Sequence, residues 1–253
     1  MAAKMENSSE LKIDFVLGEH DSNAAKGKIV IECIKYLLYE RHQVPTTVDQ
    51  ILRYTELEMA EGGRNVVSRR PTVSSRNDSK KRIQLYNDLK CLFQNVEHLF
   101  SSSTVSSVVL VFGSTAVSPK ESYVINFQTN VNSIKGSNDI KSESSQKRLS
   151  RKLIRTLVMN QELRSFKEIS STPLLVFVRV PRSVENSWFK PKQSFKIPWR
   201  GNFCRILVKD TEMTEEEEAI REEDLVWLQA PVPIKGYNEK VKDASAVYSD
   251  FWN

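Results

Sequence analysis

The side chains that most often perform catalysis or bind metal ions are few in this 253-residue sequence and lie far apart in it. The histidines and cysteines are His20, His42, His98, Cys33, Cys91 and Cys204. No two of them stand at the spacing of a metal site, and no Cys-x-x-Cys pair exists. An odd number of separated cysteines predicts reduced thiols, and the apolar helical positions of Cys33 and Cys91 place both in the core.

Motifs of enzyme active sites are also absent from the sequence. The glycines form neither a GxxxxGKS/T nor a GxGxxG phosphate-binding loop, and no serine stands in a GxSxG turn. Carboxylates are plentiful, but a run such as residues 215–218 is typical of solvated charge. The sequence therefore predicts a protein without catalytic, cofactor-binding or metal-binding residues, and a small enzyme of unrecognised class is kept as a third hypothesis.

A basic and aromatic segment near the C-terminus has the clearest binding character. Trp188, Phe189, Pro191 and Lys192 lie within five consecutive residues. An ordinary strand does not require this combination, and the proline stiffens the backbone that presents the lysine, which lowers the entropy lost on binding. We expect the surrounding region to form a terminal β-meander, with strands at residues 194–197 and 203–208.

The first predicted helix, residues 24–42, is apolar on two opposite sides. One side is formed by Val30, Ile34, Leu37 and Leu38, and the other by Ile29, Cys33 and Tyr36. Such a helix is either enclosed in the core or contributes one side to a partner, and the residues alone leave both alternatives open.

The fourth predicted helix, residues 146–166, has a core stripe formed by Leu149, Leu153, Leu157 and Leu163. Ile154 and Val158 lie outside this stripe, next to Arg151, because each residue turns the helix by ~100°. They are either scattered exposed apolar residues or the centre of an interface, where apolar side chains and arginine are both common.

The remaining elements predict the α+β class: a single domain with helices packed on one face of a mainly antiparallel sheet. Further helices are predicted over residues 47–57 and 82–100, and strands over residues 105–112, 123–127 and 174–180. The expected organisation is a flexible N-terminus (1–23), a domain (24–237) with a disordered basic loop (61–81) and a polar loop (130–145), and a C-terminal tail (238–253). Within the N-terminus, Ile13, Phe15 and Val16 are compatible with a short strand.

The chain is mildly basic, with a net charge of +5 and an isoelectric point near 9.0. Charge of this size does not by itself indicate a nucleic-acid partner. The basic residues within 64–82 and 147–155 nevertheless support a second hypothesis, a nucleic-acid or chromatin-binding module. No apolar run approaches the ~20 residues needed to cross a bilayer, so we expect no membrane partner.

Five short motifs carry a resemblance to a known family. They are LYERHQVP (38–45), SPKESY (118–123), WFKPK (188–192), PWRG (198–201) and WLQAP (227–231). In this order and spacing, they resemble the comet family of Mad2-binding proteins, over residues 26–236. Each motif is unspecific alone, and their combination makes the resemblance specific.

The resemblance implies a HORMA-like domain, similar to Mad2 itself, that acts as a non-enzymatic adaptor. The adaptor binds closed Mad2 through a pseudo-symmetric HORMA–HORMA interface and presents it to a hexameric AAA+ remodelling ATPase. Conversion of Mad2 to its open form dismantles the mitotic checkpoint complex and silences the spindle assembly checkpoint. The implied location is the nucleus and cytoplasm, with the spindle or kinetochore in mitosis.

Site residues follow from the resemblance position by position. The implied HORMA-partner interface is Tyr36, Tyr39, Glu40, Arg151, Ile154, Arg155 and Val158, and the implied ATPase contact is Trp188, Phe189, Pro191 and Lys192. Ile154 replaces an aromatic residue of the family, and Glu40 replaces a glutamine. An isoleucine covers less area than an aromatic ring, and a glutamate requires a donor or cation opposite it, so we expect compensating changes in the cognate partner.

Overall fold

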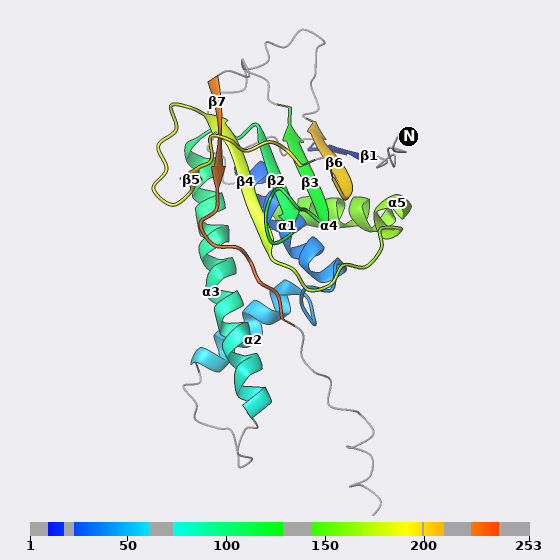
Figure 1. Ribbon diagram of the computed structural model, residues 1–253, viewed down its shortest axis with the longest axis vertical. Coiled ribbons are helices and arrows are strands. Elements are labelled where there is room, and N and C mark those ends of the chain that lie inside the picture. The colour runs from blue at the N-terminus through cyan, green and yellow to red at the C-terminus, as the bar shows by residue number, and fades with distance from the viewer. Residues whose placement is uncertain are drawn as a thin grey trace, which may run out of the picture.

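A seven-stranded mixed sheet with α-helices on one face forms the body of the protein in the computed structural model (Figure 1). The structure describes residues 10–17, 23–60, 73–128, 143–198, 200–209 and 224–237. In chain order the elements are β1 (Glu10–Val16), α1 (Asn23–Glu40), α2 (Val48–Ala60), α3 (Val73–Ser102), β2 (Ser107–Phe112), β3 (Glu121–Phe127), α4 (Glu143–Met159), α5 (Gln161–Arg164), β4 (Leu174–Pro181), β5 (Lys190–Pro191), β6 (Asn202–Lys209) and β7 (Leu225–Gln229). The predicted α+β class is confirmed.

The position of β6 in the sheet differs from the sequence-based prediction. The strand order is β1-β6-β3-β2-β4-β7-β5, and β6 lies between β1 and β3, parallel to both. The other four neighbouring pairs, β2–β3, β2–β4, β4–β7 and β5–β7, are antiparallel. The predicted terminal β-meander is therefore wrong, because β6 and β7 are separated by three strands. The sheet as a whole is still mainly antiparallel, as expected.

A second apolar cluster lies on the face of the sheet that is turned away from α1 and α4. Strand residues form most of it, and Phe195 packs on them from outside the strands; its buried members are Val109, Val111, Val124, Leu175, Phe177, Phe195 and Phe203. The ring of Phe195 stacks on Phe177 with 4.0 Å between ring centroids and meets Trp227 edge-on at 4.9 Å. The strand predicted at residues 194–197 is wrong for this reason: the segment lies across the sheet and contributes a side chain to its covering.

β1 corrects the flexible N-terminus that was expected over residues 1–23. Leu11, Ile13 and Phe15 are buried, while Lys12 and Asp14 between them are exposed. This alternation is typical of a strand with one face in the core. β1 pairs with β6 along its whole length, so the folded domain includes residues well before the expected boundary at residue 24.

Two helices begin earlier than predicted, and one is interrupted. α3 begins inside the basic loop expected over residues 61–81, and α4 begins inside the polar loop expected over 130–145; both expected loops are therefore too long. Residues 61–72 and 129–142 lie outside the described residues. The single helix predicted over 146–166 is divided at Asn160, whose side-chain oxygen accepts a hydrogen bond from the Leu163 N–H at 2.8 Å and caps α5.

α1 is enclosed in the core on both of its apolar sides. The residues of its two predicted stripes are all buried, and α1 packs against α3 and α4 (Figure 1). The core alternative for this helix is therefore confirmed, although Tyr39 in the last turn is 46% exposed. Among the helices that the structure describes, none is both long enough and apolar enough to cross a membrane.

Candidate partner-binding surfaces

The first candidate site lies on α1 and α4, and we call its residues the helix surface. It comprises Tyr36, Tyr39, Glu40, Arg151, Ile154, Arg155 and Val158. On α1, Tyr39 is exposed, Glu40 is half-buried, and only 8% of Tyr36 is exposed. The three α1 residues therefore range from a surface side chain to one that belongs to the core.

The α4 part of the helix surface has an apolar centre between two arginines. Ile154 is half-buried against the core, and Val158 is 40% exposed. Arg151 and Arg155 are both exposed, which leaves their guanidinium groups available at the edge of the patch. This arrangement resembles the core and rim of a protein interface, where rim charges affect orientation and association rate more than affinity.

The two parts of the helix surface belong to helices that contact each other. The last turn of α1 lies beside the end of α4 and α5, because Arg41 contacts Phe166 with 5.8 Å between its guanidinium carbon and the ring centroid. On the other side of α4, Lys152 donates a hydrogen bond from its Nζ to the Val16 carbonyl oxygen at 2.6 Å. α4 therefore packs against both β1 and α1.

Tyr36 is the most perturbed group of the helix surface. Burial raises the pKa of its phenol to about 12, and the carboxylate of Glu40 adds to this increase. Among the described residues, its hydroxyl oxygen has no hydrogen-bond partner. The side chain is thus a neutral phenol at neutral pH with an unused hydrogen-bonding group.

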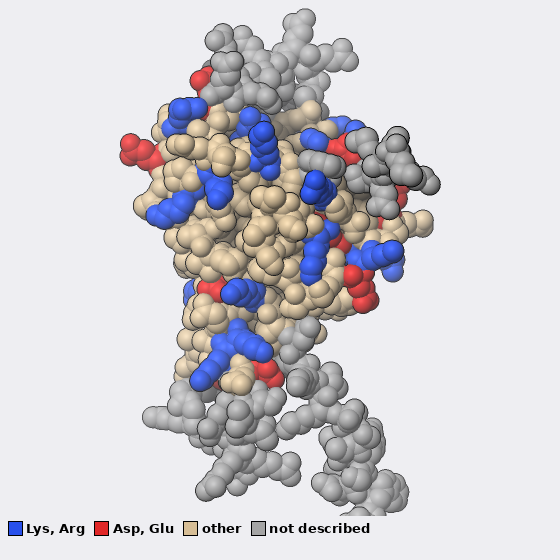
Figure 2. Space-filling model, viewed as in Figure 1, with Lys and Arg blue, Asp and Glu red and all other residues tan. Residues whose placement is uncertain are grey.

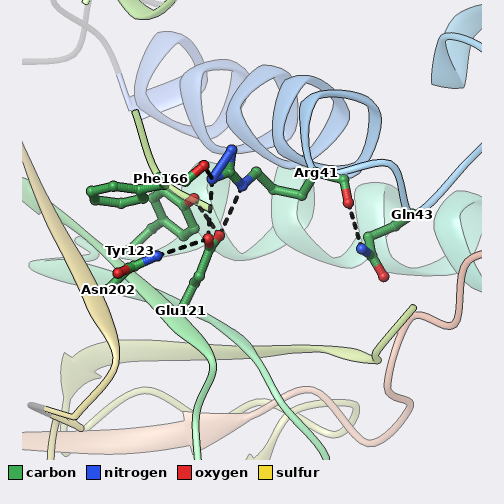
Figure 3. A network of polar contacts seen from close by, with 6 residues as sticks. All are labelled: Arg41, Gln43, Glu121, Tyr123, Phe166 and Asn202. Carbon is green, nitrogen blue, oxygen red and sulfur yellow. Dashed lines mark hydrogen bonds and ion pairs between the residues drawn. The ribbon is translucent and has the colours of Figure 1, made fainter. Parts of the chain in front are cut away.

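A buried polar network beneath the helix surface was not predicted from the sequence (Figure 3). Arg41, just after α1, donates from Nε to Glu121 Oε2 at 2.9 Å and from an Nη to Glu121 Oε1 at 3.0 Å. Glu121 also accepts from the Tyr123 hydroxyl at 2.7 Å and from the Asn202 amide at 3.3 Å. The network joins the end of α1 to the first residues of β3 and β6, so it fixes the helix surface relative to the sheet.

Gln43 extends this connection to the C-terminal part of the chain. Its side-chain amide donates to the Arg41 carbonyl oxygen at 2.5 Å, and its Oε1 accepts from the Thr172 N–H at 2.7 Å. A Cβ on Gly236 would lie 1.8 Å from the Gln43 carbonyl oxygen, so the close approach of the two backbones requires glycine. The LYERHQVP motif, which supported the family resemblance, is therefore also a structural junction.

The second candidate site is the aromatic and basic segment of residues 186–192, which we call the β5 segment. Phe189 is fully buried, and Trp188 is half-buried with its ring edge-on to Phe189 at 4.8 Å. The side chain of Asn186 accepts hydrogen bonds from the N–H groups of Trp188 at 3.0 Å and Phe189 at 2.8 Å. Phe189 therefore fixes the segment to the core, and its side chain is not part of the accessible surface.

Pro191 and Lys192 are the accessible end of the β5 segment. Both are exposed, and the Lys192 N–H donates to the Trp227 carbonyl oxygen at 2.8 Å. β5 is an edge strand, paired with β7 through Lys190↔Gln229 and Pro191↔Leu228. The sheet thus supports a rigid backbone from which the Lys192 ammonium group reaches solvent.

Basic side chains are spread over the face of the molecule seen in Figure 2, and acidic side chains lie among them, mostly toward its margins. In the nearby PWRG motif, Trp199 lies outside the described residues, and Gly201 has a φ of 78°. A Cβ on Gly201 would lie 2.4 Å from the Lys120 carbonyl oxygen, so this turn requires glycine.

No group of three or more histidine, cysteine, aspartate or glutamate side chains suited to a metal ion is found among the described residues. Cys33 and Cys204 are buried, and Cys91 is half-buried. Burial raises the pKa of the Cys33 thiol far above its ordinary value, and it raises the pKa of Cys204 to about 12. These two thiols are protonated and unreactive at neutral pH. The predicted core position of Cys33 is confirmed.

Comparison with known proteins identifies the family of this chain. Residues 12–239 match the family model of p31comet, described as "Mad1 and Cdc20-bound-Mad2 binding". The chain belongs to the p31comet family. It is 26% identical over 211 residues to the human MAD2L1-binding protein, covering 82% of this chain and 73% of the relative. The mouse MAD2L1-binding protein is 26% identical over 212 residues, covering 82% and 72%.

Membership of the p31comet family confirms the resemblance and the HORMA-like fold that it implies. The match begins inside β1 and ends just after the last described residue of the C-terminal region, so both candidate surfaces lie within it. The sequence patterns and the family resemblance named the residues of both surfaces, and the roles of these residues stay predictions. The patterns did not show that Tyr36 and Phe189 are buried, because the burial of each depends on residues distant in the chain.

Proposed function

We propose that this member of the p31comet family is a non-enzymatic adaptor that binds closed Mad2 through the helix surface. The observation that carries the proposal is a set of apolar side chains on two packed helices: Tyr39 on α1 and Val158 on α4 are exposed, and Ile154 on α4 is half-buried between two exposed arginines in the sequence. Apolar side chains exposed in this way, with arginines beside them, are typical of a protein–protein interaction site. The family description and the names of both relatives support Mad2 as that partner.

In the proposed function, the adaptor also presents Mad2 to a hexameric AAA+ remodelling ATPase through Pro191 and Lys192. The support is the exposure of both residues on a backbone that β7 and the buried Phe189 hold in place. Conversion of closed Mad2 to its open form would dismantle the mitotic checkpoint complex and silence the spindle assembly checkpoint. Action on this complex places the protein in the nucleus and cytoplasm, and at the spindle or kinetochore in mitosis.

The test is capture of closed Mad2 from the same organism by the full-length chain. Wild type is expected to retain it, and the double change Ile154→Arg, Glu40→Arg is expected to lose it, because one charge is added and another is reversed within the contact. Val117→Arg is a matched control, since Val117 is 84% exposed in the turn between β2 and β3. Retention by the control, with unchanged unfolding curves for all variants, would place the interface on α1 and α4.

Failure of well-folded wild type to capture closed Mad2 would overturn this proposal and favour the nucleic-acid hypothesis. That hypothesis has limited support in the described residues. Arg82, at the end of the predicted basic loop, is buried and donates to Glu58 at 2.6 Å, so it is used within the fold. Arg151 and Arg155 are exposed, and residues 64–72 lie outside the described part of the chain. Nucleic-acid binding would weaken steeply as salt rises.

A further inference from the structure

The hydroxyl group of Tyr36 is an exception among the tyrosines of the core. Tyr86 and Tyr123 are also buried, and each hydroxyl makes hydrogen bonds within the fold. The Tyr86 hydroxyl donates to Glu56 at 2.9 Å, and the Tyr123 hydroxyl donates to Glu121 at 2.7 Å. Tyr36 is 8% exposed, and its hydroxyl oxygen has no partner among the described residues. A buried hydroxyl without a partner is costly, so its retention requires an explanation.

The location of Tyr36 offers an explanation for its unpaired buried hydroxyl. Glu40 follows it by one helical turn on the same side of α1, and Arg164 on α5 lies near enough to affect its phenol. Glu40 is half-buried and Arg164 is exposed, so both long side chains belong to the boundary between core and solvent. The hydroxyl therefore lies close to two long side chains at the boundary between the core and the helix surface.

We propose that Tyr36 is a specificity-determining residue of the helix surface, whose hydroxyl donates a hydrogen bond to a neutral amide oxygen of the docked HORMA partner. This inference rests on the proposed binding of closed Mad2. Docking displaces the side chains of Glu40 and Arg164, and the partner's acceptor then reaches the phenol. The hydrogen bond that the free protein lacks is made only in the complex, so it adds to affinity and discriminates against partners without an acceptor.

The electrostatic surroundings select the chemistry of this acceptor. The phenol keeps its proton at neutral pH, as an ordinary tyrosine does, and burial and the Glu40 carboxylate raise its pKa further, so it acts as a donor. A second carboxylate would be repelled by Glu40. Two cations oppose this effect, but the charge of Arg41 is already engaged by Glu121, and Arg164 is exposed, so solvent screens its attraction for an anion. An amide oxygen, from the main chain or from asparagine or glutamine, accepts the bond without these penalties.

The experiment compares Tyr36→Phe with Tyr54→Phe in the full-length chain, using closed Mad2 from the same organism as the ligand. Tyr36→Phe is expected to raise the Kd by about 5- to 15-fold, as loss of one net hydrogen bond implies. It is also expected to leave the free energy of unfolding unchanged or higher, because the free protein makes no use of the hydroxyl. Tyr54 is the matched control: it lies on α2, outside the helix surface, and its side chain is 57% exposed, so a change below about twofold is expected.

Each outcome supports or overturns the inference. An unchanged Kd for Tyr36→Phe, together with lost binding for Ile154→Arg, would overturn it and leave the proposed function intact. Lower stability of Tyr36→Phe would also overturn it, since the hydroxyl would then be bonded in the free protein. Absence of binding by wild type would instead contradict the proposed function. A double-mutant cycle with asparagine and glutamine residues of Mad2 should reveal coupling to Tyr36, and coupling only to a carboxylate would contradict the neutral acceptor.

Discussion

Arg41 and Glu121, which are 80 residues apart in the chain, form an ion pair with two hydrogen bonds in the interior of the protein. Their side chains are 4% and 0% exposed. Tyr123 and Asn202 also donate to the carboxylate, so the buried negative charge has a donor on several sides (Figure 3). This pair holds the end of α1 on the sheet, and the helix surface therefore depends on a contact that no partner touches.

Arg41→Met is expected to lower the free energy of unfolding by about 3–5 kcal/mol, because it leaves the Glu121 carboxylate buried without its counter-charge. Denaturant unfolding followed by circular dichroism measures this change. Lys209→Met is the control: it breaks a 2.6 Å ion pair with Asp14, but the side chains are 35% and 58% exposed. Its cost should stay below about 1 kcal/mol. Equal losses in the two variants would contradict the special role of the buried pair.

Much of the fold could be predicted because its signals are local. The uninterrupted apolar run of β2 indicated a strand buried on both faces, and all its residues are buried. The position of β6 could not be predicted in this way, since its alternation of buried residues fits any neighbour in the sheet. The Arg41–Glu121 pair had no local signal either, because charged residues 80 positions apart do not indicate their contact.

In the candidate site, too, some features have a local signal in the sequence and others depend on residues distant in the chain. Helical spacing alone separated Ile154 and Val158 from the leucine stripe of α4, and the structure places Ile154 at the edge of the core and Val158 on the surface. The burial of Phe189 was not visible in a basic segment, because it results from packing against distant strands. The resemblance supplied the roles of the residues, whereas the structure shows which side chains a partner can reach.

The isoleucine at position 154 leads us to expect that the chain binds Mad2 from its own organism more tightly than Mad2 from a distant species. The family resemblance implies an aromatic residue at this position, and an isoleucine covers less area. Ile154→Phe should therefore strengthen binding to closed Mad2 from a distant species whose comet protein has the aromatic residue, and weaken binding to the cognate Mad2. Titration calorimetry with both partners measures the two effects. Equal affinity of the wild-type chain for both partners would contradict the compensating change.

Lys192→Glu is expected to reduce association with the AAA+ ATPase at least tenfold while leaving the affinity for closed Mad2 unchanged, because the β5 segment and the helix surface are separate. Loss of a close charge pair in a partly desolvated contact costs this much or more. Lys196→Glu, also exposed and four residues further along the chain, is the matched control for net charge. Surface plasmon resonance with immobilised ATPase measures both variants. A similar loss in the control would indicate general attraction between charges and no specific contact at Lys192.

The buried thiols predict both chemical protection and a loss of stability at alkaline pH. Cys33 and Cys204 have pKa values raised by burial, whereas in the unfolded chain the same thiols ionise near their ordinary pKa of 9.0. As pH rises above about 9, the unfolded chain loses these protons and the folded chain keeps them, so the free energy of unfolding falls. The Cys33→Ala variant should show a smaller fall in the free energy of unfolding between pH 8 and 10, measured by urea unfolding at several pH values.

In the native protein at pH 8, a thiol reagent should modify the half-buried Cys91 first. Modification of Cys33 or Cys204 at the rate of Cys91 would show that the two thiols are not enclosed as the fold requires.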